Sequence, residues 1–187
     1  MLPLTFPNIL TLLRIVMVPV IVVALLEETP NADTIAAVVF AVAAFTDGLD
    51  GYIARWRGSV TNFGKLMDPI ADKLLIIAPL ISLVSLDRIA PWVAMVIIAR
   101  ELAVTALRIV AVERGVVIPS SLLGKAKTIL QVAAIFAVIA FPGSAAADAL
   151  LYAAVVVTVV SGADYFFGVR RHLEQARRDS SARRGSP

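Results

Sequence analysis

Residues 47–72 read DGLDGYIARWRGSVTNFGKLMDPIAD, a short stretch that carries four aspartates. They are Asp47, Asp50, Asp68 and Asp72. The first two are three residues apart and the last two are four apart, so on helices each pair would share one face. Two helices joined by a short link would place the four carboxylates opposite each other. The segments that flank this stretch therefore decide the fold.

The flanking sequence is that of an integral membrane protein. Of the 187 residues, 59% are hydrophobic and only 17% are charged, whereas ordinary soluble domains are about 25% charged. The chain has no cysteine, which excludes disulfides, thiolate nucleophiles and cysteine-ligated metals. Its apolar start lacks a basic leader and is interrupted by Arg14, so we expect a retained first helix and not a signal peptide.

Six apolar segments predict an all-α fold with six transmembrane helices. A bilayer span takes about 20 residues, and these segments are too long for barrel strands, so their backbone amides must be paired within helices. The segments are 8–26, 33–55, 64–86, 89–112, 121–141 and 145–168. Residues 1–168 would form a transmembrane catalytic domain. Residues 169–187 would form a basic cytoplasmic tail that is disordered at its end.

The positions of lysine and arginine predict the orientation. The links after the second and fourth segments and the region beyond residue 168 are basic, whereas the opposite side has only Arg88. Both termini and the aspartates should therefore face the cytoplasm, with the chain in the cell membrane. The basic tail would be attracted to anionic lipid headgroups.

The aspartates predict a divalent-metal site. A carboxylate at mid-bilayer costs roughly 2.5–3.5 kcal/mol on insertion scales, so a compensating partner is required. Oxygen ligands without histidine or cysteine suit Mg²⁺ or Mn²⁺ better than zinc, and four clustered carboxylates can bind two ions that assist a phosphoryl displacement. Gly51 and Ala54 share the face of Asp47 and leave room for a ligand or a facing helix. Helix caps or interfacial ion pairs would not explain why the acidic residues repeat on two stripes.

The spacing D-x2-D-G-x2-A-R-x8-G-x3-D-x3-D resembles, without a departure, the signature of the CDP-alcohol phosphotransferases. The six-helix layout fits that family over nearly the whole chain. The residues at the fixed positions are Asp47, Asp50, Gly51, Ala54, Arg55, Gly64, Asp68 and Asp72.

The resemblance implies a division of labour among the aspartates. Asp47, Asp50 and Asp68 would hold two ions, Mg²⁺ or Mn²⁺, with Asp72 within reach of the second. Asp72 would also be the general base that takes a proton from the acceptor hydroxyl. The resulting alkoxide would attack the lipid-linked phosphorus and release CMP. A homodimer is a further implication of the resemblance, and no nucleic-acid partner is expected.

The resemblance also implies a site for the CDP part of the substrate, formed by Gly51, Arg55 and Thr61. A guanidinium such as that of Arg55 can pair two phosphate oxygens. The sequence PNILTLLR, at residues 7–14, looks like a family feature too. Asn8 is expected either to cap the first helix or to bind the nucleotide phosphate.

Two other residues of this first segment carry expectations. Thr11 is expected to act as a helix cap. Arg14 lies too deep in the apolar segment to have no partner, so we expect a buried carboxylate or phosphate beside it.

The acceptor alcohol must be inferred from residues further along the chain. Arg100, Glu101 and Arg108 are three charges in an otherwise apolar segment. A structural Arg–Glu pair would account for two of them, and the remaining cation needs an anion, for which a small phosphate is a natural candidate. Lys125 and Lys127 add two cations to the next segment, although they are also explained as ordinary basic residues of the cytoplasmic side.

The patterns R-E-x6-R and G-K-x-K-T-x2-Q resemble the branch of the family that makes phosphatidylglycerophosphate. This resemblance implies CDP-diacylglycerol as the donor and glycerol 3-phosphate as the acceptor, within membrane lipid. The residues that would gather the acceptor's phosphate are Arg100, Arg108, Lys125 and Lys127.

Three alternatives remain open. Within the same family, the product could be cardiolipin or a phosphatidylinositol phosphate. An aspartate-rich membrane prenyltransferase would usually have more helices and two separated acidic motifs, whereas this chain has one continuous motif. A divalent-metal transporter would be favoured by discontinuous helices near the midplane, whereas this acidic cluster is expected near one membrane surface.

Overall fold

The computed structural model describes residues 6–27, 29–57, 62–113 and 122–184, and side chains in these ranges except at 6–8, 47–57, 62–66 and 172–184. The six predicted helices are confirmed, and all but one of their ends lie within a turn of the expected position. They are α1 (Phe6–Leu26), α2 (Ala32–Arg57), α3 (Asn62–Ser85), α4 (Pro91–Glu113), α5 (Leu122–Ala140) and α6 (Ala145–Arg184).

The exception is the end of α6, which runs to Arg184 and not to residue 168. The sequence beyond Gly168 is rich in arginine, which is a strong helix former even where it is too polar for a bilayer. The expectation of a disordered chain end is therefore wrong as far as Arg184. The division into a catalytic domain and a basic tail stays a prediction.

The helices differ in how well they suit a membrane. Among the described residues, three stretches are long and apolar enough to span a bilayer: Ile9–Leu26, Leu122–Ala140 and Ala145–Arg171. A shorter apolar stretch, Ala32–Thr46, lies in α2. The apolar sequence of α4 is interrupted by four charged residues, Arg100, Glu101, Arg108 and Glu113. Together with the all-helical architecture, these spans make the chain a multi-pass membrane protein.

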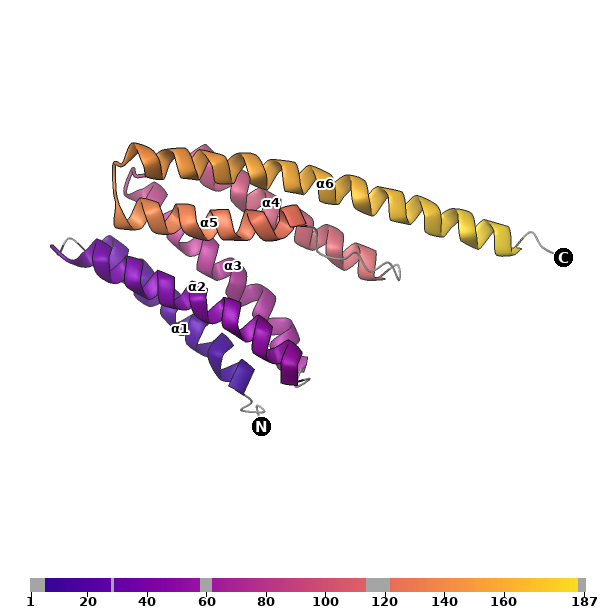
Figure 1. The fold of residues 1–187 in the computed structure, drawn as a ribbon, viewed down its shortest axis with the longest axis horizontal. Helices are drawn as coiled ribbons and strands as arrows, with labels where there is room; N and C mark the ends of the chain where they lie inside the picture. The colour runs from indigo at the N-terminus through magenta and orange to yellow at the C-terminus, as the bar shows by residue number, and fades with distance from the viewer. Residues whose placement is uncertain (1–5, 28, 58–61, 114–121, 185–187) are drawn as a thin grey trace.

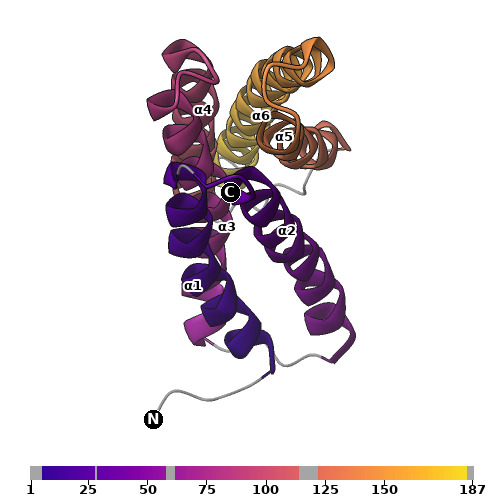
Figure 2. The same ribbon diagram turned by 90° about the vertical axis from the view of Figure 1, so that its left-hand side faces the viewer.

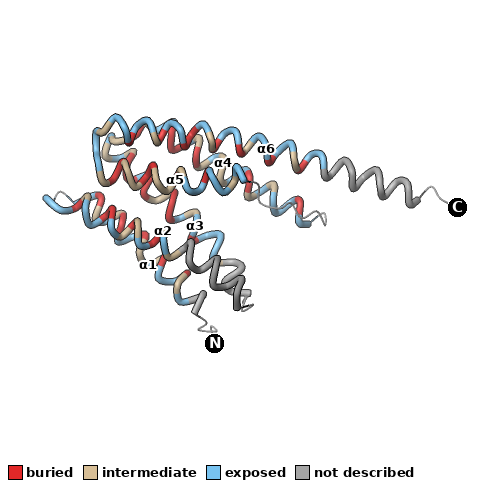
Figure 3. Tube along the Cα trace, in the orientation of Figure 1, coloured by how far each residue is buried: buried red, intermediate tan, exposed pale blue. Residues whose placement is uncertain are grey.

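The helices form two groups of three that share one core. α1 packs on α2 and α3, α6 packs on α4 and α5, and contacts of α2 with α5 and of α3 with α4 and α5 join the groups (Figures 1 and 2). Buried positions lie where helices face one another (Figure 3). Many exposed positions are large and apolar, as expected of a lipid-facing surface. Fully buried core residues include Ile21, Phe40, Leu80, Ile97 and Ile139.

Successive helices run in opposite directions, so both ends of the chain lie on one side of the bundle (Figure 1). The starts of α2, α4 and α6 lie at the opposite side, which we call the far end. There Arg88, in the link between α3 and α4, donates to both carboxylate oxygens of Asp33 in the first turn of α2, at 2.6 and 3.1 Å. Arg88 is the basic residue that departs from the predicted charge asymmetry, and Asp33 neutralises it.

Candidate functional site

Two of the four predicted metal ligands lie within the described side chains, both on α3. Asp68 and Asp72 are one turn apart and exposed. Thr11 Oγ1 donates to Asp68 Oδ1 at 2.5 Å, and Arg14 Nη1 donates to Asp72 Oδ1 at 2.7 Å. Both donors come from α1 and are 2% exposed, whereas the side chain of Asp72 is 49% exposed. Buried groups of α1 therefore hold carboxylates that remain open on the other side.

These contacts decide two expectations about α1. A carboxylate partner of Arg14 is confirmed as Asp72, but this carboxylate is exposed and not buried as expected. The expectation that Thr11 caps the helix is wrong, because α1 begins at Phe6 and Thr11 lies in its interior. Its hydroxyl instead donates to Asp68 on α3, a contact between segments that are far apart in the sequence.

The rest of the predicted metal and nucleotide site belongs to parts of the chain whose side chains are not described. Asp47, Asp50, Gly51 and Arg55 lie within α2, and Asn8 lies within α1. Thr61 lies outside the described residues. Among the described side chains no cluster of three metal-ligand residues is found, and these side chains include only half of the predicted aspartates.

The described half of the predicted metal site, Asp68 and Asp72, has the chemistry that a hard divalent cation prefers. Mg²⁺ and Mn²⁺ take oxygen ligands, and Asp68 and Asp72 present carboxylates from one face of α3. Partners that hydrogen-bond to metal-ligating carboxylates fix their orientation, and Thr11 and Arg14 are placed to do so. These residues therefore fit a divalent metal.

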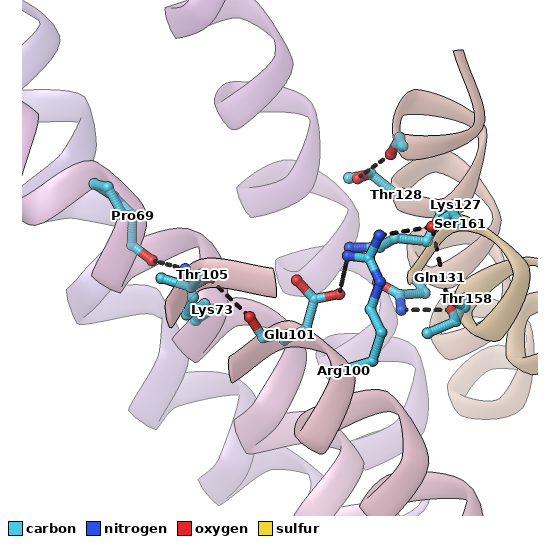
Figure 4. Close-up of polar contacts among 11 residues, drawn as sticks. Pro69, Lys73, Arg100, Glu101, Thr105, Lys127, Thr128, Gln131, Thr158 and Ser161 are labelled. Atoms are coloured by element: carbon cyan, nitrogen blue, oxygen red, sulfur yellow. Dashed lines mark hydrogen bonds and ion pairs between the residues drawn. The ribbon is translucent and has the colours of Figure 1, made fainter. Parts of the chain in front are cut away.

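A second polar cluster joins α4, α5 and α6. Glu101 Oε1 of α4 accepts a hydrogen bond from Lys127 Nζ of α5 and lies 3.4 Å from Arg100 Nη1 (Figure 4). Arg100 Nη2 donates to Ser161 Oγ of α6 at 2.6 Å. The side chains of Arg100, Glu101 and Lys127 are only 12%, 15% and 7% exposed. We call Arg100, Glu101 and Lys127 the cation cluster.

The positive charges of the cation cluster outnumber its negative charge. Glu101 supplies one negative charge against the two positive charges of Arg100 and Lys127. Arg108 and Lys73 lie close enough to add their positive fields to those of Arg100 and Lys127, respectively. Within the described part of the chain, the buried Nε of Arg100 has no hydrogen-bond partner. A buried charge without a counter-ion is costly, so the cluster favours an additional anion.

The structure brings together two of the four residues predicted to bind the acceptor's phosphate, Arg100 and Lys127. Arg108 lies two turns further along α4, is exposed, and places its guanidinium carbon 5.8 Å from the ring centroid of Tyr165. Lys125 is exposed in the first turn of α5. The expected Arg–Glu pair is confirmed as Arg100–Glu101, and Lys127 also bonds to this glutamate.

Sequence reasoning missed the contribution of α6. Ser161 accepts from Arg100, the ring of Tyr165 faces Arg108, and Thr158 Oγ1 accepts from Gln131 Nε2 at 2.9 Å. Thr158, Ser161 and Tyr165 recur at intervals of three and four residues, so they share one helix face. Buried polar residues at this spacing in an apolar helix were the available signal.

Comparisons with known proteins place the chain among lipid-forming transferases. The family model for CDP-alcohol phosphatidyltransferase matches residues 4–160. The chain is 42% identical over 181 residues to CDP-diacylglycerol–glycerol-3-phosphate 3-phosphatidyltransferase of Bacillus subtilis, covering 86% of this chain and 92% of the relative.

Two further relatives bear on the product. The chain is 43% identical over 180 residues to a probable phosphatidylglycerophosphate synthase of Mycobacterium tuberculosis strain H37Rv, covering 93% of this chain and 86% of the relative. It is 36% identical over 174 residues to cardiolipin synthase (CMP-forming) of Oryza sativa, covering 84% of this chain but 53% of the relative. The chain belongs to the CDP-alcohol phosphatidyltransferase family.

Proposed function

We propose that this protein transfers the phosphatidyl group of CDP-diacylglycerol to glycerol 3-phosphate, giving phosphatidylglycerophosphate and CMP. Relatives named for this reaction are 42–43% identical to the chain over most of its length. The single structural observation that carries the choice of acceptor is the excess positive charge of the cation cluster. An acceptor with its own phosphate supplies the anion that this cluster lacks.

The acceptor's phosphate would bind at the cation cluster. Lys127 is buried and Arg100 is only 12% exposed, and Arg100 Nε is a donor without a partner among the described residues. Arg108 and Lys125 are exposed on the neighbouring parts of α4 and α5 and would complete the site from its open side. Charge-assisted hydrogen bonds to phosphate are stronger than neutral ones, so a phosphorylated alcohol would bind better than the free alcohol.

The divalent metal would be held by Asp47, Asp50, Asp68 and Asp72. When bound, two Mg²⁺ or Mn²⁺ ions would neutralise the pyrophosphate and stabilise the entering and leaving oxygens. Thr11 and Arg14 would keep the carboxylates of Asp68 and Asp72 turned to the site. The CDP part would contact Gly51, Arg55, Thr61 and Asn8.

Asp72 would act as the general base. One oxygen of its carboxylate accepts a hydrogen bond from Arg14, and its side chain is 49% exposed, so it would be open to the acceptor's hydroxyl. The acceptor hydroxyl would lose its proton to Asp72 while its oxygen forms a bond to the lipid-linked phosphorus. The bond from that phosphorus to the bridging oxygen breaks, and CMP leaves with this oxygen. Holding both substrates in line supplies much of the catalysis.

The reaction would take place at the cytoplasmic face of the cell membrane. Both termini lie on the same side of the bundle as the ends of α2 and α4 (Figure 1), and the basic residues of the sequence concentrate on that side. A homodimer, a catalytic domain over residues 1–168 and a basic tail over 169–187 complete the proposal.

The second candidate is cardiolipin formation, which the rice relative favours. An enzyme that makes cardiolipin in the CMP-forming reaction takes a lipid acceptor and would not need a pocket for a free phosphate monoester. The buried excess of positive charge at Arg100 and Lys127 argues for the phosphorylated acceptor.

An acceptor panel tests the proposal. Purified protein would be incubated with CDP-diacylglycerol, Mg²⁺ and radiolabelled glycerol 3-phosphate, phosphatidylglycerol or inositol phosphate, and both CMP and lipid products would be measured. We expect glycerol 3-phosphate to give labelled lipid and an equal amount of CMP. Product from another acceptor alone would overturn the assignment, and metal flux into proteoliposomes without CMP release would indicate transport.

A further inference from the structure

One face of α6 contacts both arginines of the proposed acceptor site. Ser161 and Tyr165 lie one turn apart on this face and are buried, at 1% and 8% exposed. Ser161 contacts Arg100, and Tyr165 contacts Arg108. The two arginines are themselves two turns apart on α4, so α6 meets the cationic stretch of α4 at both of its arginines.

The first contact depends on a small residue next to the serine. A Cβ atom at Gly162 would lie 3.1 Å from Arg100 Cγ and 3.5 Å from Arg100 Nε. The stem of Arg100 would have to shift by a few tenths of an ångström to make room for this atom, while its guanidinium is held by the 2.6 Å hydrogen bond to Ser161. Glycine at 162 therefore leaves room for the stem of Arg100, while Ser161 fixes one side of its guanidinium.

The second contact uses an aromatic face. The guanidinium carbon of Arg108 lies 5.8 Å from the ring centroid of Tyr165, within the range of a cation–π interaction. The hydroxyl of Tyr165 is buried and has no hydrogen-bond partner in the described part of the chain. The ring, and not the hydroxyl, is therefore the part of Tyr165 that acts on Arg108.

We propose that Ser161, Gly162 and Tyr165 of α6 are positioning residues that aim Arg100 and Arg108 at the acceptor's phosphate. Arginine side chains have many rotamers, and ordering them on binding reduces affinity. A site whose arginines are already held in place loses less side-chain entropy on binding and therefore less affinity. This inference rests on the proposed function, since it assumes that the two arginines bind the phosphate of glycerol 3-phosphate.

The test measures both substrates' KM and kcat in the purified full-length protein, with a matched control on the same helix. The variants are Ser161→Ala, Gly162→Ala and Tyr165→Leu. The control is Val160→Ala, because Val160 is an exposed apolar residue of α6 beside Ser161. Tyr165→Phe separates the ring from the hydroxyl. Thermal unfolding of each variant without substrates reports damage to the fold.

We expect the KM for glycerol 3-phosphate to rise about tenfold in Ser161→Ala, since a hydrogen bond to a charged group is lost. About a threefold rise is expected in Tyr165→Leu, as for a modest cation–π contact, and a rise in the same direction is expected in Gly162→Ala. In each of these variants the KM for CDP-diacylglycerol should equal the value measured for the Val160→Ala control. Tyr165→Phe should behave as wild type.

Two results would overturn the inference while the proposed function stands: equal changes in the KM of both substrates, or a fall in kcat alone. If Tyr165→Phe were as impaired as Tyr165→Leu, the hydroxyl and not the ring of Tyr165 would be the important group. If Ser161→Ala does not fold, Gly162→Ala and Tyr165→Leu still decide the question. Wild type that makes no product from glycerol 3-phosphate would instead refute the proposed function.

Discussion

Two arginine–carboxylate contacts lie in different parts of the bundle and differ in their charge balance. At the far end, Arg88 and Asp33 form one cation with one anion, and both carboxylate oxygens accept hydrogen bonds from Arg88. In the cation cluster, Glu101 Oε1 is shared by Arg100 and Lys127. The first contact is satisfied within the protein. The second leaves one positive charge in excess, which we propose that the acceptor's phosphate neutralises.

The comparison shows how a structural ion pair differs from the proposed binding site. Both contacts use the same chemical groups, so neither residue type nor burial alone separates them. Charge balance and hydrogen-bond satisfaction separate the two contacts, because a buried guanidinium nitrogen without a partner is costly. Arg100 has such a nitrogen among the described residues.

The largest expected effect concerns the proposed general base. Asp72→Asn should lower kcat by about 10²–10⁴-fold, the usual contribution of general acid–base catalysis, while binding of the CDP-lipid and the fold are kept. Asparagine still offers Arg14 an oxygen acceptor. Asp33→Asn at the far end is the matched control and should keep kcat. Near-normal turnover in Asp72→Asn would show that another group takes the proton.

The second-largest effect is expected from removing the guanidinium of Arg100 from the cation cluster. Arg100→Ala should raise the KM for glycerol 3-phosphate by about 10- to 100-fold, since a hydrogen bond to a charged group contributes roughly 1.5–3 kcal/mol. Steady-state kinetics with each substrate varied in turn measures this. An unchanged acceptor KM would mean that Arg100 serves only to hold α4 against α6.

A smaller effect is expected from the exposed arginine. Arg108→Ala should raise the acceptor KM by about threefold to tenfold, because an exposed charge is screened by solvent. The KM for CDP-diacylglycerol should rise less. Equal increases for the two substrates would assign Arg108 a structural role in holding α4 against α6.

The smallest kinetic effect is expected at the far end. Arg88→Ala should leave both KM values and kcat unchanged, because its ion pair lies on the other side of the bundle. The partly exposed pair should contribute about 1 kcal/mol to stability at most, which thermal unfolding in detergent can measure. An altered acceptor KM in this variant would show that the Arg88–Asp33 pair, like the cation cluster, affects acceptor binding, and the distinction between the two contacts would be lost.

The sequence predicted the helices well because hydrophobic length and proline or glycine breaks act locally. It also predicted a partner for Arg14, since a deep arginine in an apolar helix must have one. It did not identify Asp72 as that partner. Thr11 was misjudged because its role depends on α3, which is remote in sequence.

The proposed acceptor site shows the same limit. The excess of cations could be read from Arg100, Arg108, Lys125 and Lys127. That Lys127 bonds to Glu101, and that α6 supplies Ser161 and Tyr165, depends on how three helices pack. The end of α6 was misplaced because apolarity marks where a bilayer ends, whereas a helix can continue beyond it.

The most direct test compares glycerol 3-phosphate with glycerol as acceptors, in wild type and in Arg100→Ala, through kcat/KM. The two acceptors differ only in the phosphate that the cation cluster is proposed to bind. We predict that wild type strongly prefers glycerol 3-phosphate and that Arg100→Ala narrows this preference by about tenfold or more, the loss of one charged hydrogen bond. An equal preference in both proteins would contradict the proposed role of the cation cluster.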